Sequence, residues 1–104
     1  SIKMIELKTI KKISKNEYLK YFLLKSFSLE MLIILYENEH VESIDRLYLS
    51  LHSFVPKMPA FLNYLSFLEQ KQCILKLINE EKNSSRKVVL NEKCKSELTI
   101  LLNH

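Results

Sequence analysis

The chain contains no glycine among its 104 residues, and this absence restricts its turns more than any other feature. Glycine adopts positive φ at little cost, so turns that need this conformation must use asparagine or aspartate instead. The absence also excludes three kinds of site that are built on glycine: the P-loop, the dinucleotide-binding GxGxxG turn and the nucleophile elbow.

Length and composition fit a single packed domain over residues 1–104, since 47% of the residues are hydrophobic. No apolar run approaches the roughly 18–20 residues needed to cross a bilayer, so we expect no membrane partner. The N-terminal stretch mixes lysine and glutamate among its apolar residues, unlike a signal peptide. We therefore expect a cytoplasmic protein.

The first quarter of the chain is helical in pattern. Apolar residues among lysines over 2–13 predict an amphipathic helix. The stretch SKNE at 14–17 matches a capping box, with Ser14 as N-cap, and predicts a helix over 17–26. The cap favours a break and the flanking helical residues favour continuity, so one helix and two both remain open for 2–26.

The middle of the chain continues with helices. Ser28 is expected to cap a central apolar helix with Glu30 in its first turn. Residues 40–43 fit a short strand or a link, and Ser43 is expected to cap a helix over 44–51.

Proline marks the start of the next helix. Pro56 and Pro59 place it near Lys57, because proline is tolerated in the first helical turn and not deeper. This helix is expected to end near residue 71.

Two β-favouring runs follow, at 73–78 and 86–90, and they predict a hairpin with its loop at 79–85. Asn91 is expected to cap a last helix. The order predicts an α+β, mostly helical fold, a winged helix-turn-helix in which residues 43–71 form the helix-turn-helix and 73–90 the β-hairpin wing.

Three stretches resemble the MarR/SarA group of bacterial winged-helix regulators, its SarA branch above all: SFSLEMLIILYENE, PKMPAFLNYLSFLEQKQCI and SSRKVVLNEKCKSEL. The resemblance implies a homodimeric DNA-binding transcriptional regulator, with flanking dimerisation helices in the N-terminal region 1–26 and the C-terminal helix 91–103. It implies a recognition helix in the major groove and a wing arginine, here Arg86, in a neighbouring minor groove. The group usually has an acidic residue where this chain has Ser84, and the last helix is short.

The expected recognition helix has two faces when its residues are placed at roughly 100° intervals. The predicted core side carries Met58, Phe61, Leu62, Leu65 and Leu68. The opposite side carries Ala60, Asn63, Ser66, Phe67 and Gln70. Amide side chains suit adenine, a hydroxyl suits a base or a phosphate, and a methyl group suits thymine. The alternative is that Asn63 and Gln70 are ordinary solvent-exposed helix residues with no role in base recognition.

Phe67 does not suit a wet DNA face. It is expected to pack under the wing or against the first helix, or to mark a protein-binding surface.

The wing carries the second group of candidates. An arginine gains from the negative potential of a narrow A-tract minor groove, and lysines bind phosphates, although Arg86 also fits a solvated charge at a strand end. The candidate DNA-binding residues are Lys57, Ala60, Asn63, Ser66, Gln70, Lys82, Ser84, Arg86 and Lys87.

Cys73 and Cys94 do not form a disulfide framework, and the histidines are scattered, so neither a metal nor another cofactor is expected. Cys94 begins the last helix, where the helix dipole lowers a thiol pKa, so a redox role and an ordinary half-buried thiol both stay open. No catalytic grouping is evident, and an enzyme is not expected.

Two functions remain. The first is a homodimeric regulator that binds AT-rich duplex DNA, with DNA and a second copy as partners. The alternative is a winged-helix protein-protein interaction module, such as an anti-repressor or a plasmid or phage accessory factor. Phe67, the lack of an arginine on the recognition helix and the short last helix favour this alternative.

Overall fold

The computed structural model describes residues 6–82 and 85–103 and is α+β and mostly helical, as expected. Within these residues lie five α-helices, one 3₁₀ helix and one two-stranded antiparallel sheet. In chain order the elements are α1 (Leu7–Lys15), η1 (Lys20–Leu23), α2 (Ser28–Glu37), α3 (Ile44–Ser50), α4 (Met58–Gln70), β1 (Ile74–Ile78), β2 (Arg86–Leu90) and α5 (Glu92–Leu102). In the described part of the chain, every helix is too short or too polar to span a bilayer.

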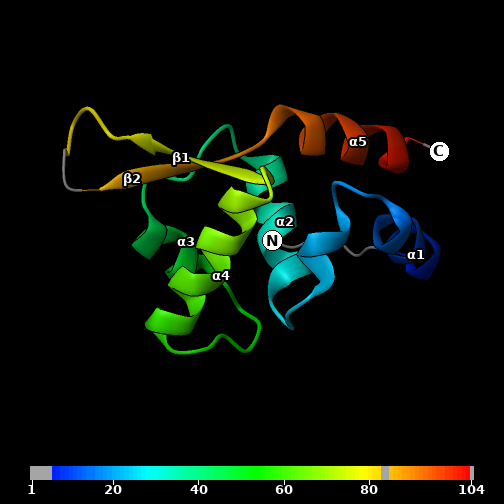
Figure 1. The fold of residues 1–104 in the computed structure, drawn as a ribbon, viewed down its shortest axis with the longest axis horizontal. Helices are drawn as coiled ribbons and strands as arrows, with labels where there is room; N and C mark the ends of the chain where they lie inside the picture. Colours follow the sequence, from blue (N-terminus) through cyan, green and yellow to red (C-terminus); the bar gives the residue numbers. More distant parts are fainter. Residues whose placement is uncertain (1–5, 83–84, 104) are drawn as a thin grey trace.

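The elements divide between two ends of an elongated molecule that measures 40 × 26 × 26 Å. Figure 1 shows the hairpin of β1 and β2 projecting at one end, above α3 and α4, with α1 and α5 at the other end. Helix α2 lies between the two groups, and its buried residues join the single core cluster.

The capping box predicted at residues 14–17 is wrong. Ser14 lies inside α1, and its hydroxyl donates to the carbonyl of Lys11. Asn16 ends α1 instead, and its side-chain oxygen accepts from the backbone N–H groups of Tyr18 and Leu19 at 2.9 and 3.0 Å. An asparagine oxygen competes well for local N–H groups, which favours a turn over a continuing helix. Residues 6–26 therefore do not form one helix, and residues 2–5 of the predicted range lie outside the described residues.

The helix predicted over 17–26 is also wrong, because this stretch makes turns and the short 3₁₀ helix η1. Leu19 and Phe22 are both fully buried, and their spacing of three matches the three residues per turn of a 3₁₀ helix.

Ser28 is the first residue of α2 and not its cap. Its hydroxyl accepts from the N–H of Lys25 and donates to the hydroxyl of Tyr64 at 2.8 Å. The predicted central position of this helix is confirmed, because six of its ten residues are buried, Met31 and Leu32 among them.

Residues 40–43 contain a single bridge and not a full strand. Val41 and Val88 exchange both backbone hydrogen bonds at 2.9 Å, which ties the segment before α3 to β2. The next prediction is confirmed: Ser43 caps α3, accepting from the N–H of Arg46.

The core side predicted for α4 is partly wrong. Phe61, Leu65 and Leu68 are buried, but Leu62 is 39% exposed and Tyr64 is only 5% exposed. Tyrosine can be buried when its hydroxyl finds partners. Tyr64 finds the hydroxyl of Ser28 on α2 and the carbonyl of Tyr21 on η1.

We expected asparagine or aspartate at turns that need positive φ, but the junction of α4 and β1 uses a glutamine. Gln72, with φ 63°, is the only non-glycine residue with positive φ in the described chain. It reverses the chain after α4, so that the N–H of Cys73 reaches the carbonyl of Leu68 at 2.8 Å.

The hairpin has the predicted antiparallel strands, with Ile74 opposite Leu90 and Ile78 opposite Arg86. Ile74, Val88 and Leu90 turn one face of the hairpin into the core. The last predicted cap is confirmed, because Asn91 accepts from the N–H of Lys93 at 2.9 Å.

A buried carboxylate holds the loop between α3 and α4. The two oxygens of Glu30 accept from the backbone N–H groups of His52 and Ser53 at 2.7 and 2.8 Å. Burial acts to raise the pKa of Glu30, but hydrogen bonds from Ser53 and His52 outweigh it and lower the pKa below the usual 4.5.

Glu30→Gln should lower the free energy of unfolding near pH 7 by about 1–3 kcal/mol, because glutamine keeps one acceptor oxygen. One of the two charge-assisted hydrogen bonds then becomes neutral, and the other is lost because its N–H group faces an amide NH₂ donor. The folded-state pKa of Glu30 is lowered, so its stabilisation is complete above the unfolded value and disappears as the pH falls through the folded value. Urea unfolding from about pH 7 to 3 should therefore show a smaller acid-induced loss in the variant than in the wild type. Exposed Glu17→Gln is the control, and equal losses in Glu30→Gln and wild type would contradict this account.

Candidate nucleic-acid interface

The solvent-facing strip of α4 is the first part of the candidate interface. Helical spacing places Asn63, Ser66 and Gln70 together on this strip, and all three are exposed. Leu62 and Glu69 border it on the side of β1, where the carboxylate of Glu69 pairs with Lys76 at 3.4 Å. The strip therefore offers amide and hydroxyl groups beside an apolar side chain.

Ala60 is exposed but lies on the flank of α4 and not at the centre of the strip. It lines a hollow of about 600 Å³ together with Leu24, Lys25 and Phe67, and Asn63 also reaches this hollow. Asn63, Ser66 and Gln70 therefore share the solvent strip, and Ala60 lies beside Asn63 on the flank of that strip.

Phe67 packs against the N-terminal segment, not under the hairpin. Its ring centroid lies 5.7 Å from that of Tyr21, in an edge-on contact, and 6.2 Å from that of Tyr64. The ammonium group of Lys71 lies 5.8 Å from the Phe67 centroid. Contact with η1 therefore explains how an aromatic residue occupies the outer half of α4.

The hairpin divides its predicted basic residues between two faces. Arg86 is opposite Ile78, on the face that continues from the core, whereas Lys87 is opposite Leu77 on the other face. Lys87 lines a hollow of about 660 Å³ together with Glu37, Glu39 and Glu92. Because of the strand pleat, the two neighbouring cations cannot contact one flat surface together.

Lys82 lies near the tip of the hairpin, and Ser84 lies outside the described residues. Lys82 borders a hollow of about 630 Å³ with Arg46, Asp45 and Glu42. Lys57 is exposed at the start of α4, where it precedes the first helical turn.

Sequence reasoning missed Lys76. It is opposite Val88 in the hairpin register, so it lies on the core-side face with Arg86, although only 19% of its side chain is exposed. Lys76 is two residues from Ile74 in the strand, so alternation places both side chains on the same face once the hairpin register is known. Its ion pair with Glu69 links β1 to the solvent strip of α4.

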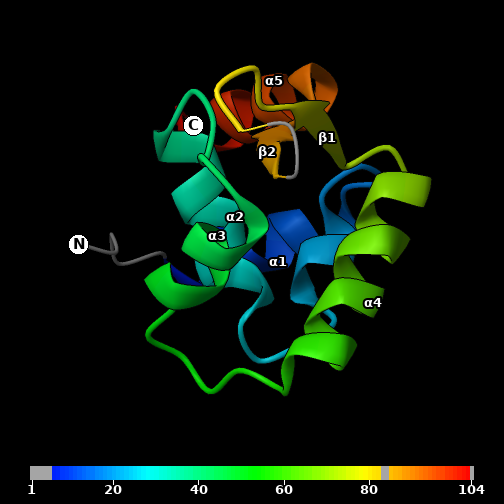
Figure 2. The ribbon, with the colours of Figure 1, turned by 90° about the vertical axis from the view of Figure 1, so that its left-hand side faces the viewer.

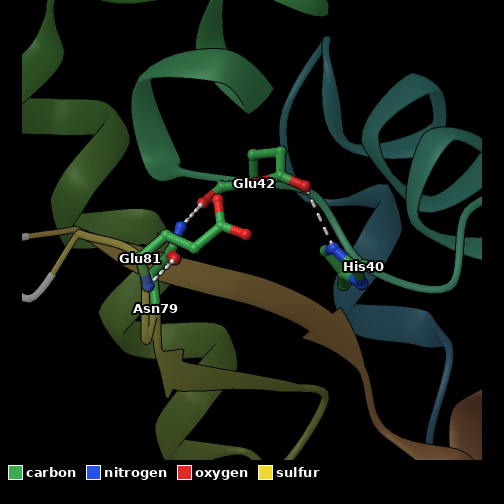
Figure 3. A network of polar contacts seen from close by, with 4 residues as sticks. All are labelled: His40, Glu42, Asn79 and Glu81. Atoms are coloured by element: carbon green, nitrogen blue, oxygen red, sulfur yellow. Dashed lines mark hydrogen bonds and ion pairs between the residues drawn. The ribbon is translucent and has the colours of Figure 1, made fainter.

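A buried asparagine anchors the base of the hairpin loop (Figure 3). The side chain of Asn79 donates to the carbonyl of Glu42 at 3.2 Å and accepts from the N–H of Glu81 at 3.0 Å. Its backbone carbonyl accepts from the N–H of Lys82. Figure 3 also shows the ring of His40 reaching the carboxylate of Glu42, a contact of 3.2 Å. The loop is therefore tied to the segment before α3.

The charge of this surface is mixed. Glu69 is the only charged residue within α4, and its partner Lys76 offsets it. In the hairpin loop, Glu80 and Glu81 precede Lys82 and Arg86. Positive charge therefore lies at the ends of α4 and on the hairpin, while the middle of α4 has hydrogen-bonding groups without a strong field.

The two cysteines lie together in the core. Both are free and buried, and their thiols point to the carbonyl of Tyr18 at 3.6 Å from Cys73 and 3.5 Å from Cys94. The pKa of Cys94 is raised by its hydrogen bond with Cys73 and by burial, whereas that same bond lowers the pKa of Cys73. The helix start therefore does not lower the pKa of Cys94 here.

In residues 6–82 and 85–103, no three His, Cys, Asp or Glu side chains lie in an arrangement that could hold a metal ion. No family model matches the sequence, no curated protein is significantly similar to it, and no solved structure matches its fold.

The thiol of Cys94 should react far more slowly than free cysteine with a thiol reagent near pH 7, because it is buried and its pKa is raised. Mass mapping after timed labelling separates Cys94 from Cys73, and labelling in urea gives the rate for the unfolded chain. A native rate for Cys94 near that of free cysteine would contradict this expectation and favour the redox reading.

Proposed function

We propose that the protein is a winged-helix transcriptional regulator of the bacterial type, which binds AT-rich duplex DNA as a homodimer. The observation that carries the proposal is one arrangement of elements. A helix pair, α3 and α4, is followed directly by a hairpin, and Val41 adds a bridge to that hairpin at the start of the pair. This order is typical of winged helix-turn-helix domains.

In this proposal the solvent strip of α4 enters the major groove. Asn63 and Gln70 are two turns apart on one face, so both can meet base edges, where a side-chain amide pairs with adenine through two hydrogen bonds. Ser66 lies between them and suits a base or a phosphate. The lack of arginine within α4 leaves no bidentate donor for guanine, which favours AT-rich sites.

The hairpin would supply the second contact. Ile74, at the α4 end of the hairpin, pairs with Leu90, and Arg86 lies four residues away from Leu90 along β2. The rise per strand residue therefore places Arg86 roughly 13 Å from that end. Adjacent grooves of a duplex follow one another at about half a helical turn, or about 17 Å. Arg86 thus suits a neighbouring minor groove, and Lys57 and Lys82 suit the phosphates on either side.

The far end of the molecule suits a dimer contact. α1 packs against α5, where Asn16 donates to the carboxylate of Glu97 at 3.0 Å. Leu7, Ile100 and Leu102 remain exposed on these two helices. Apolar side chains exposed on paired helices favour burial against a second copy.

The first test is selection of bound duplexes from a random pool, followed by affinity measurements over salt. If a dimer neutralises roughly 6–10 phosphates, affinity should fall by about 10³–10⁵ between about 50 and 200 mM salt. Two half-sites in the selected DNA and a dimer mass in light scattering are expected with it. A monomer with a nearly flat salt dependence would rule out this mode of binding.

The second test concerns the hairpin. Arg86→Ala should weaken binding to AT-rich duplex more than to GC-rich duplex, because a narrow minor groove enhances the potential that an inserted arginine meets. Lys87→Ala is the matched control, since Lys87 lies on the opposite hairpin face and can contribute only charge. Equal losses on the two duplexes for Arg86→Ala would show that Arg86 supplies charge alone.

A further inference from the structure

A preformed groove runs along the flank of α4 that faces the N-terminal segment. Two hollows, of about 600 and 190 Å³, share Lys25, Ala60 and Tyr64, so they adjoin each other along the helix. Phe67 closes one end and Phe54 the other. From Ala60 to Phe67 the groove follows two turns of α4, or roughly 10 Å.

The floor and walls of this groove are mostly apolar, and two of the side chains that line it are largely exposed to solvent. Phe54 is 81% exposed and Leu24 is 57% exposed. An apolar patch rimmed by polar groups is typical of an interaction site.

The exposure of Phe54 does not reflect a loose loop. Its carbonyl accepts from the hydroxyl of Ser26, and the carbonyl of Pro56 accepts from the hydroxyl of Tyr48 at 2.7 Å. Glu30 holds the two preceding N–H groups. Figure 2 shows this loop crossing from α3 to the base of α4. The phenyl ring is therefore presented by a fixed backbone, which lowers the entropic cost of binding.

The rim of the groove is positive. Lys25 lines both hollows, Lys57 adjoins Pro56 at one end, and Lys71 lies 5.6 Å from the ring of Tyr21 at the other. Among the described residues that line the two hollows, none is acidic. An apolar floor with lysines along its edges complements a partner with the opposite rim charge.

We propose that this groove binds a short acidic amphipathic helix of another protein, with one apolar side chain against Leu24 and Phe67 and a second against Phe54. Helix-in-groove recognition uses anchors on one helical face, and two turns of helix match the length of the groove. The groove shares Asn63 with the solvent strip of α4, but the proposal does not rest on DNA binding by that strip.

Two other occupants fit less well. A duplex presents phosphates that pair with the lysines of the rim, but it offers no apolar surface to the phenyl and leucine side chains between them. A second copy that offered α1 would set the four lysines of that helix against the lysines of the groove.

The test uses a fluorescein-labelled helical peptide of about 14 residues, with leucine anchors on one face and glutamates beside them. Two companion peptides replace the glutamates by lysines or the leucines by serines. We expect anisotropy to report binding of the acidic peptide alone, and amide shifts in labelled protein to fall within residues 20–27 and 54–71.

Matched surface variants locate the site. Lys25→Glu and Phe54→Ser should each weaken peptide binding about tenfold, a loss of about 1.4 kcal/mol. The controls Lys8→Glu on α1 and Leu49→Ser on α3 are exposed and lie outside the lining of the groove, so they should change peptide binding less than about twofold. Circular dichroism confirms that all four variants fold.

Three results would overturn the proposal. The first is no binding of the acidic peptide, or binding that ignores both Lys25→Glu and Phe54→Ser. The second is displacement of the peptide by bare duplex together with an equal loss of duplex affinity in Lys25→Glu, which would make the groove part of a DNA surface. The third is a dimer that Phe54→Ser converts to monomer, which would identify a second copy as the occupant.

Discussion

The hydroxyl of Tyr64 fixes how α4 is rotated in this molecule. It bonds both to Ser28 at the start of α2 and to the carbonyl of Tyr21 in η1, so three elements meet at one oxygen. Burial raises the pKa of this phenol to about 12, so it stays protonated and keeps both bonds at ordinary pH. With Tyr64 turned inward, Leu62 turns out, Ala60 faces Lys25, and Asn63, Ser66 and Gln70 define the solvent strip. The polar strip and the apolar groove are therefore two results of the same rotation.

Local sequence predicted the elements whose signals are local. Ser43 and Asn91 cap helices as expected, and the hairpin strands begin and end within a residue of the predicted runs. The predictions were wrong where a residue distant in sequence determines the local structure. Nothing near Tyr64 in sequence indicates Ser28 or Tyr21, so periodicity alone placed Leu62 in the core. Ser14 and Asn16 could each accept from backbone N–H groups, and Asn16 is the residue that ends the helix. The side-chain amide of Asn16 also donates to Glu97 on α5, a contact that the local sequence does not indicate.

The candidate site was predictable in its parts but not in its assembly. The sequence indicated exposed polar residues on α4 and cations on the hairpin, since composition and period carry that information. Strand alternation alone separates Arg86 from Lys87, but which of the two lies on the core-side face is decided by Val88 and Leu90, which enter the core. Lys76 and the flanking groove depend on how β1 and η1 lie against α4, which is a property of the tertiary fold.

The left-handed residue at the end of α4 has a mechanical consequence. A glutamine in this conformation stores about 1–2 kcal/mol of backbone strain, and it persists because the bonds of Cys73 to Leu68 and of Gln72 to Glu69 hold the reversal closed. The ion pair of Glu69 with Lys76 adds a second link between α4 and β1, so a change in the angle between α4 and the hairpin would break several contacts. A duplex that contacts both elements would have to bend to fit the fixed angle between them. The stiffness of the DNA sequence between the two contacts would then affect the binding affinity.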